Sequence, residues 1–403
     1  MQILTFTTLY PSAARPQHGI FVETRLRKLV ESGRITARVV APCPWFPFVS
    51  TRFGEYGAMA RVPHREVRHG IEIEHPRYPL PPKIGMSMAP LALFAAALPA
   101  LRREITEGRD FELIDAHYFY PDGVAAVMLG RALDRPVVVT ARGSDVNLIA
   151  DYALPRRWIR WAAGRADGLI AVSTGLRDRL TALGTRPERI NVLRNGVDLA
   201  LFRPGDRAAA RRALGFTRPT LLAVGNLVAL KRHRLMVEAL RMLPEADLVI
   251  VGDGPERAAI EASAQARGVA DRVRLLGRLA QDQLPQIYGA ADLLLLVSTH
   301  EGWPNVLLES MACGTAVLAS EIAGIADIVA APEAGRIVGD VTPQRLAIAI
   351  RDGLAAPPAR AATRAYAEQF DWQSTTDGQI ALFCEIGARQ LATAPAQRRS
   401  TRA

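Results

Sequence analysis

The sequence predicts an α/β protein built from two doubly wound, Rossmann-like domains. Short apolar runs alternate with helical stretches along nearly the whole chain, which is typical of parallel sheets with right-handed crossovers. The length of 403 residues also exceeds the ~100–200 residues of one typical domain. A polar, turn-rich segment at 195–204 (NGVDLALFRP) separates two such series of elements. We therefore expect domains at residues 1–195 and 196–370.

In the first half, apolar runs of about four to eight residues are expected to form buried strands, and the longer periodic stretches are expected to form helices. Residues 42–70, which are rich in Pro, Arg and aromatic side chains, are expected to form an extended loop. The expected strands are 2–6, 36–41, 71–74, 112–116, 136–140, 168–172 and 190–193. The expected helices are 20–31, 88–107, 122–133, 156–163 and 174–182.

The second half repeats the same alternation of strands and helices. At the end of the chain, residues 391–403 are expected to form a mobile tail. The expected strands are 220–224, 247–251, 273–276, 292–297 and 315–319. The expected helices are 233–241, 256–267, 281–289, 305–313 and 343–354.

The most informative segment is EGWPNVLLESMACGTAVLAS, residues 301–320. Pro304 suits the first position of a helix because it has no N–H to donate, and Gly314 is expected to end that helix. Glu301 then lies in the loop after a buried strand, and Glu309 lies about two turns into the helix. A helix N-terminus at the carboxyl end of a parallel strand binds anions and nucleotides. Two carboxylates beside such an anion site predict a site for a sugar nucleotide.

This segment resembles the E-x7-E signature of the family-4 glycosyltransferases, retaining sugar transferases of the GT-B fold, in which two Rossmann-like domains face each other across a cleft. The resemblance implies that Glu301 faces the transferred sugar and that Glu309 holds the ribose hydroxyls of the donor. It also implies that backbone amides around Asn305, Val306 and Leu307 meet the pyrophosphate. The alternative for Glu309 is a solvated helix residue.

The resemblance covers both halves and implies further donor-site residues. The segment AVGNLVALKRH (223–233) resembles the loop that supplies cations to the donor diphosphate, which singles out Lys231, one of only three lysines. An ammonium can follow a leaving phosphate as a point charge, whereas the alternative is a surface lysine. The segment at 371–386 resembles the closing helix that returns to the first domain, which implies such a helix at residues 371–390. The remaining donor-site residues that we assign are Gly19, Gly225, Asn226, Arg278, Leu279, Trp303 and Pro304.

Two positions depart from the family pattern. Asn226 follows Gly225 where the family commonly has Arg, and TARGSDV (140–146) has Arg142 where many members have His. Arg142 either restores the cation missing at 226 or forms a structural pair with Asp145 or another carboxylate. We place Arg142 and Asp145 with Glu301 and Lys231 in the catalytic group.

His117 and Asp145 both follow expected strands of the first domain and are therefore candidates for the acceptor side. The alternative for His117 is a hydrogen-bonded packing residue.

No two aspartates are two positions apart, so the Asp-x-Asp pair that holds a metal in many transferases is missing. Lys231, backbone N–H groups and a helix N-terminus are then left to stabilise the leaving phosphate. We expect metal-independent, retaining transfer of a hexose-like sugar, with no cofactor, in polysaccharide or glycolipid assembly. The rival readings are a GT-B sugar-nucleotide epimerase and a non-catalytic carbohydrate-binding protein. A dehydrogenase is disfavoured because no G-x-G-x-x-G follows a strand.

Charge and cysteine content indicate the compartment and the partners. Residues 1–195 carry +9 and residues 196–403 carry +1 of the net charge of +10, and no basic run interleaved with aromatics suggests nucleic acid. The three cysteines, which have no paired spacing, indicate neither disulfides nor zinc, so we expect a cytoplasmic protein. The apolar segment 81–103, flanked by Lys83, Arg102 and Arg103, is expected to be too short and too Pro-interrupted to span a bilayer. It is either a surface that docks on anionic lipid near a lipid-linked acceptor or a core helix.

Overall fold

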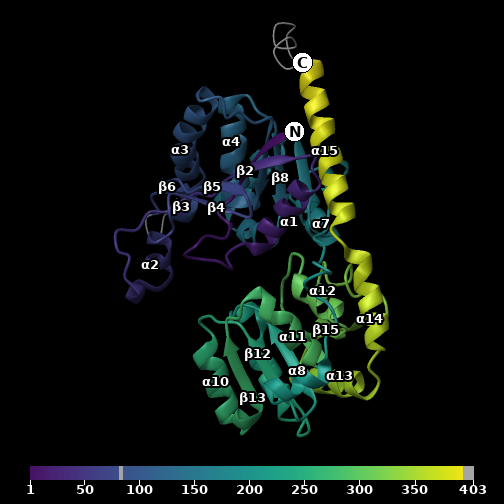
Figure 1. Ribbon diagram of the computed structural model, residues 1–403. Helices are drawn as coiled ribbons and strands as arrows, with labels where there is room; N and C mark the ends of the chain where they lie inside the picture. The colour runs from purple at the N-terminus through teal and green to yellow at the C-terminus, as the bar shows by residue number, and fades with distance from the viewer. Residues whose placement is uncertain (81–84, 394–403) are drawn as a thin grey trace. The chain divides into compact units, whose positions relative to one another are not determined.

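A computed structural model describes residues 1–80 and 85–393, and the chain divides into two compact units (Figure 1). Unit 1 comprises Met1–Arg194 together with the chain from Gln373 onward, and unit 2 comprises Asn195–Trp372. The sequence analysis placed these boundaries after residues 195 and 370. Lys83 and residues 394–403, which make up most of the predicted tail, lie outside the described residues.

Unit 1 is built on an eight-stranded sheet in the order β10-β9-β8-β7-β1-β2-β5-β4. All neighbouring strands are parallel except β4, which runs antiparallel to β5 at the edge. β1 pairs with β2 on one side and with β7 on the other, so the direction of winding changes between β1 and β7. The strands are β1 (Gln2–Phe6), β2 (Thr36–Val40), β4 (Arg65–Arg68), β5 (Ile71–Glu74), β7 (Leu113–His117), β8 (Val137–Ala141), β9 (Gly168–Ala171) and β10 (Ile190–Val192).

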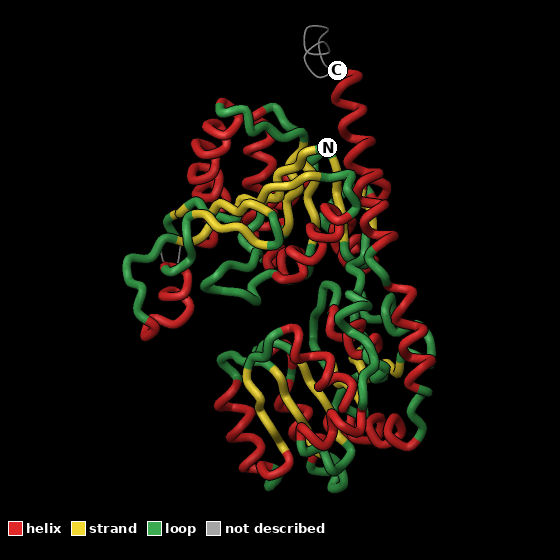
Figure 2. Tube along the Cα trace, in the orientation of Figure 1, coloured by secondary structure: helices red, strands yellow, loops and turns green. Residues whose placement is uncertain are grey.

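Helices cover both faces of this sheet, as expected for a doubly wound unit (Figure 2). The first α-helix starts and ends where the apolar periodicity predicts. A separate two-stranded ribbon, β3 (Cys43–Pro44) with β6 (Arg77–Tyr78), lies outside the main sheet. The α-helices are α1 (Ile20–Glu31), α2 (Gly54–Ala60), α3 (Gly85–Thr106), α4 (Val124–Leu133), α5 (Ser144–Asn147), α6 (Ala153–Ala163), α7 (Thr174–Ala182) and α15 (Gln373–Thr393).

Helix α3 corrects two expectations. It has 22 residues, and in the part of the chain that the structure describes it alone is long and apolar enough, by length and composition, to cross a membrane. It also continues through Pro90 and Pro99, which we expected to interrupt it. Leu93, Ala97 and Leu101 are fully buried and line one face of the helix. Burial of that face compensates for the backbone hydrogen bonds that the two prolines cannot make.

The segment 42–70 is not a continuous extended loop. It contains β3, a short 3-10 turn, α2 and β4, and its turns are held by long-range contacts. The guanidinium of Arg77 donates to the carbonyls of Met59 and Val62, and Trp45 N donates to Tyr78 O. Local sequence patterns could not reveal these elements because the contacts that hold them come from residues outside the segment.

Unit 2 is built on an all-parallel six-stranded sheet in the order β13-β12-β11-β14-β15-β16. The sequence analysis missed β16, α8 and α14, which are short or lie in polar stretches. The strands are β11 (Thr220–Val224), β12 (Asp247–Val251), β13 (Val273–Gly277), β14 (Leu293–Leu296), β15 (Val317–Ser320) and β16 (Gly335–Val338). The α-helices are α8 (Arg207–Leu214), α9 (His233–Leu240), α10 (Arg257–Ala266), α11 (Leu284–Ala290), α12 (Asn305–Ala312), α13 (Pro343–Ala355) and α14 (Arg360–Ala367).

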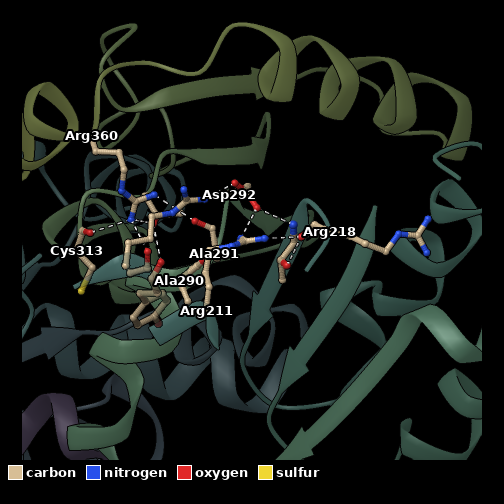
Figure 3. Close-up of polar contacts among 12 residues, drawn as sticks. Arg211, Arg218, Ala290, Ala291, Asp292, Cys313 and Arg360 are labelled. Atoms are coloured by element: carbon tan, nitrogen blue, oxygen red, sulfur yellow. Dashed lines mark hydrogen bonds and ion pairs between the residues drawn. The ribbon is translucent and has the colours of Figure 1, made fainter. Parts of the chain in front are cut away.

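Hydrogen bonds and ion pairs of arginine side chains connect the amino-terminal edge of the unit 2 sheet with its helices (Figure 3). Asp292, just before β14, accepts from Arg211 Nη1 at 2.9 Å and from Thr220 N at 2.8 Å. Arg360 of α14 donates to the carbonyl oxygens of Gly289, Ala291 and Cys313. These bonds satisfy carbonyl oxygens at the ends of α11 and α12, which have no N–H donors within their own helices.

The helix α15 joins the core of unit 1 through apolar and polar contacts. Phe383 and Ile386 belong to the buried apolar cluster of that unit. Gln379 is fully buried; its Oε1 accepts from Arg25 Nε at 2.6 Å and its Nε2 donates to Asp115 Oδ2 at 3.0 Å. One amide side chain therefore connects α15 with α1 and β7.

Replacing Gln379 by Met should lower the free energy of unfolding by about 2–3 kcal/mol. The charged, buried side chains of Arg25 and Asp115 would each lose their hydrogen bond to the Gln379 amide. Urea unfolding measures the change. Gln373→Met at the exposed start of the same helix is the control and should change stability by less than about 0.5 kcal/mol. Equal stability of the two variants would show that the network does not hold α15 in place.

Candidate functional site

The strand order of unit 2 brings two of the predicted segments together. β11 lies between β12 and β14, so the loops after β11 and β14 leave the carboxyl edge of the sheet in opposite directions. This is where open α/β sheets bind ligands. Residues 225–231 follow β11, and residues 297–304 connect β14 to α12.

Lys231 and Glu301, which lie 70 residues apart in the sequence, form an ion pair in these loops. Lys231 Nζ lies 2.5 Å from Glu301 Oε1, and the two side chains are only 18% and 12% exposed. Thr299 N donates to Leu230 O at 2.9 Å and so fixes one loop against the other. The sequence analysis selected both residues but did not predict that they touch.

Glycines allow the backbone to pack closely beside Lys231. A Cβ atom at Gly225, which has φ 151°, would lie 3.6 Å from Lys231 Cε, so a larger side chain would crowd the ammonium. A Cβ atom at Gly252 would lie only 1.9 Å from Gly225 O. Asn226, the residue that replaces the expected Arg, is exposed at the mouth of this loop.

Two residues that the sequence analysis missed support the loop of Lys231. Arg232 has φ 51° and donates from Nε to Val297 O at 2.5 Å, which ties the start of α9 to the end of β14. His233 is buried, and its pKa is lowered to about 4 by burial and by the charge of Lys231. It therefore stays neutral at physiological pH and adds no second charge beside the ammonium.

Helix α12 begins at Asn305, as predicted, and ends at Ala312, one residue earlier than predicted. Pro304 is the N-cap, with ψ 92°, and not the first helical residue, and Cys313 is the C-cap. The N–H of Leu307 donates to Pro304 O at 3.1 Å, so of the three predicted amides it is already engaged. The N–H groups of Asn305 and Val306 lie at the start of the first turn, where no intrahelical acceptor exists.

Glu309 lies just over one turn into α12, and not the two turns that the sequence analysis expected. It is partly buried and does not lie on a solvated face. The hydroxyl of Tyr288 in α11 donates to Glu309 Oε2 at 2.8 Å. Burial raises the pKa of Glu309 to about 7, and the Tyr288 hydrogen bond limits that rise. The sequence analysis placed Tyr288 only inside the expected helix 281–289, and no feature of the sequence separates it from a packing residue.

The other predicted donor-site residues of unit 2 differ in exposure. Trp303 is 6% exposed and its ring packs at 6.4 Å from Phe370, so the indole contributes to the packing beneath the loop. Arg278 and Leu279 follow β13, and Gly252 N donates to Gly277 O just before them. Arg278 is exposed.

In unit 1, Asp145 is a buried carboxylate that organises a loop. It accepts from Phe119 N at 2.6 Å and from Gly143 N at 2.7 Å, and also from Arg142 N. It is 0% exposed, and burial raises its pKa. These contacts give it a structural role and do not support direct contact with an acceptor.

His117 is also fully buried, as its packing alternative predicts. Arg142 Nη2 donates to His117 Nδ1 at 2.7 Å, and His117 Nε2 lies 3.1 Å from Asp115 Oδ2. Burial lowers the pKa of His117 to about 4, so the ring is neutral with its proton on Nε2. Arg142 is 8% exposed and reaches His117 with its side chain, while its backbone contacts Asp145. The spacing Asp115-x-His117 on one strand face was the signal that could have revealed this pair.

Gly19 is explained by packing within unit 1. It has φ 73°, and a Cβ atom there would lie 2.3 Å from the carbonyl of Leu9, so the close approach is to Leu9. The nearby Asp122, which the sequence analysis did not select, accepts from Thr8 N at 2.6 Å and from Thr7 Oγ1 at 3.2 Å. These bonds join the loops after β1 and β7, where the winding direction of unit 1 changes.

The described residues include no group of three or more His, Cys, Asp and Glu side chains that could hold a metal ion. The groups brought together in unit 2 are one ion pair, one buried carboxylate and a helix N-terminus. Such an arrangement can bind a diphosphate through cation and backbone N–H groups and sugar hydroxyls through carboxylates.

Family models match both units. Residues 206–370 match the model described as glycosyl transferases group 1, and residues 51–201 match the model described as glycosyltransferase family 4.

Individual proteins resemble the chain along most of its length. The D-inositol 3-phosphate glycosyltransferase of Acidothermus cellulolyticus is 32% identical over 374 residues, which cover 84% of this chain and 82% of that protein. A putative teichuronic acid biosynthesis glycosyltransferase of Bacillus subtilis, TuaC, is 28% identical over 81% of this chain and 83% of that protein. HepE of Anabaena, solved in complex with UDP-glucose, has the same fold, with a TM-score of 0.71 and 20% identity over 98% of this chain and 99% of that one. The chain belongs to the family-4 glycosyltransferases, enzymes of the GT-B fold.

Proposed function

We propose that this enzyme transfers a sugar from a nucleoside-diphosphate-sugar to an acceptor with retention of configuration and without a metal ion, in polysaccharide or glycoconjugate assembly. The observation that carries the proposal is the Lys231–Glu301 ion pair at the change of winding direction in unit 2, beside the N-terminus of α12.

The ion pair supports this proposal because the two charges match those that develop during the reaction. Breaking the bond from the anomeric carbon to the diphosphate leaves negative charge on phosphate and positive charge on the sugar ring. Lys231 would stabilise the phosphate, and Glu301, 2.5 Å away, would stabilise the sugar cation and position the sugar. The leaving phosphate would then accept the proton of the acceptor hydroxyl.

The remaining donor contacts would come from α12 and α11. The N–H groups of Asn305 and Val306 would meet the pyrophosphate at the positive end of the α12 dipole. Tyr288 holds Glu309 Oε2, so Glu309 Oε1 would accept from the ribose hydroxyls. Arg278 and Leu279 would lie beside the base.

The names of similar proteins favour this class of substrates. The HepE structure was solved with UDP-glucose, and TuaC is named for teichuronic acid biosynthesis. These names also favour glycosyl transfer over the epimerase and non-catalytic readings. The acceptor would bind to unit 1, whose buried Arg142, His117 and Asp145 would act by holding the loops after β7 and β8 in shape.

For the membrane, we propose docking through exposed apolar side chains of unit 1 and a location at the inner face of the cell membrane. Met86, Met88 and Leu91 on the first half of α3 are 44%, 48% and 41% exposed, whereas Leu93 is fully buried. Trp45 and Phe48 are exposed as well, and aromatic side chains favour the lipid–water boundary. Flotation with anionic and neutral vesicles tests this part, and protein that stays soluble on anionic vesicles at low salt would exclude it.

The affinity for UDP-glucose should fall as the pH is lowered through about 7, because Glu309 then becomes protonated and the ribose hydroxyls lose a charged acceptor. Calorimetry across pH 5.5–8.5 measures the effect. Glu309→Gln should weaken binding by roughly 1.5–3 kcal/mol at high pH and abolish the pH step. Tyr288→Phe should move the step upward, because the lost hydrogen bond had held the pKa down.

The exposed Glu245→Gln serves as the control for this experiment and should match the wild type. A pH step that persists in Glu309→Gln would remove Glu309 from the donor site.

Replacing Lys231 by Ala should lower turnover by about 10²–10³-fold, because a preorganised charge on the leaving phosphate is lost. Lys231→Arg retains a charge that can pair with Glu301, so it should preserve the fold while turnover still falls. Lys28→Ala is the matched control on a surface lysine of unit 1. Near-normal turnover in both Lys231 variants would show that the ion pair is structural.

Treatment with EDTA should leave glycoside formation unchanged, because the proposed charge stabilisation comes from Lys231 and backbone N–H groups. The assay is product formation before and after dialysis against the chelator. Activity that disappears and returns with magnesium or manganese would contradict the metal-independent mechanism.

A further inference from the structure

A hollow of about 480 Å³ lies on unit 1 between the end of α6 and the connection from α7 to β10. Gly164 ends α6 just before β9, and residues 183–189 precede β10. In a parallel sheet, segments that lead into strands lie at the amino-terminal edge. The hollow is therefore at the edge opposite the carboxyl ends of β7 and β8, which carry His117 and Arg142.

Four arginines line this hollow, and none of its lining residues is a carboxylate: the cations are Arg157, Arg160, Arg186 and Arg189. Arg157 and Arg160 lie three positions apart on α6 and therefore on the same face of the helix. Within residues 1–80 and 85–393, neither of these two side chains has an ion-pair or hydrogen-bond partner.

The other two arginines, Arg186 and Arg189, belong to the connection from α7 to β10. Arg189 is fixed, because Nη1 donates to Ala163 O at 3.0 Å and Nη2 to Ala166 O at 2.7 Å. Arg186 is mostly exposed and lies 3.6 Å from Glu188. Gly184 has φ 97°, and a Cβ atom there would lie 3.6 Å from Arg160 Nη2, so the glycine allows the loop to approach the guanidinium.

A neighbouring hollow is also lined by arginines, but an aspartate of the same protein pairs with one of them. It shares Arg160 with the first and is also lined by Asp151, Arg156 and Arg179. There Arg179 forms an ion pair with Asp151, and Arg156 Nη2 donates to the backbone of Asp151 at 2.7 Å. In the hollow beside Arg157, Glu188 pairs only with Arg186 among the described residues and is not part of the lining, so the charges of Arg157 and Arg160 are available to a ligand.

We propose that this hollow, lined by Arg157, Arg160, Arg186 and Arg189, binds a phosphate group at a site separate from the donor site. Guanidinium groups form paired hydrogen bonds with phosphate oxygens, and four of them can surround one phosphate or a diphosphate. The volume is that of a small-ligand site. The phosphate belongs either to the headgroup of an anionic phospholipid or to a soluble phosphorylated compound, and the two sources are separated by experiment.

The test compares the wild type with three double variants by calorimetry with inorganic pyrophosphate. In Arg157→Glu/Arg160→Glu, one class of binding should weaken by at least about tenfold, since two charge-assisted contacts are replaced by repulsion. The control, Arg131→Glu/Arg212→Glu, makes the same change in charge at two exposed arginines elsewhere and should bind like the wild type. Arg157→Gln/Arg160→Gln, which adds no repulsion, should weaken the same class of binding.

Vesicle flotation identifies the source of the phosphate. If wild type floats with vesicles that contain phosphatidic acid and the Arg157/Arg160 variants float less, the ligand is a lipid headgroup. If only pyrophosphate binding changes, the ligand is soluble. Equal pyrophosphate affinity and equal flotation of all the proteins would overturn the proposal, and so would an equal loss in the Arg131/Arg212 control.

Discussion

The position of β11 between β12 and β14 is the constraint on which the candidate site of unit 2 depends. Because of this strand order, the loops after β11 and β14 start from neighbouring strands and then run in opposite directions. Lys231 and Glu301, 70 residues apart in the sequence, form an ion pair between these two loops. The Thr299–Leu230 backbone bond and the Arg232–Val297 bond then fix the distance between the loops. The Lys231–Glu301 pair is a consequence of this sheet order more than of its own attraction, since the cost of removing two charges from water offsets much of their attraction.

Unit 1 places its charged groups differently. Arg25, Asp115, Arg142 and Asp145 are buried, where an unpaired charge would be costly. Each of them is accompanied by hydrogen-bonding partners from other elements, and the neutral Gln379 and His117 link the opposite charges. The network connects α1, α15 and the loops after β7 and β8. It therefore determines the shape of these loops while its own side chains stay buried.

Arginine has three separate roles in this chain. Some guanidinium groups satisfy carbonyls at the ends of helices, as Arg360 does at Gly289 and Arg272 does at Leu240 in unit 2. Others, such as Arg142, belong to buried networks. Arg157 and Arg160 belong to neither group, since their charge faces a hollow with no carboxylate in its lining. The high arginine content therefore does not describe the function of any one arginine, because the role of each guanidinium depends on the groups that it contacts.

The sequence by itself determined the α/β class, the two units and most of their regular elements. The apolar runs of buried strands and the periodicity of helices are both local patterns. It also selected Glu301, Glu309 and Lys231. Only the tertiary structure decided that Lys231 meets Glu301, that Tyr288 holds Glu309, and that His117 and Asp145 are buried. These facts depend on strand order and on contacts between residues distant in sequence. No local pattern encodes such contacts, since the pattern of a buried strand is the same whichever strand lies beside it.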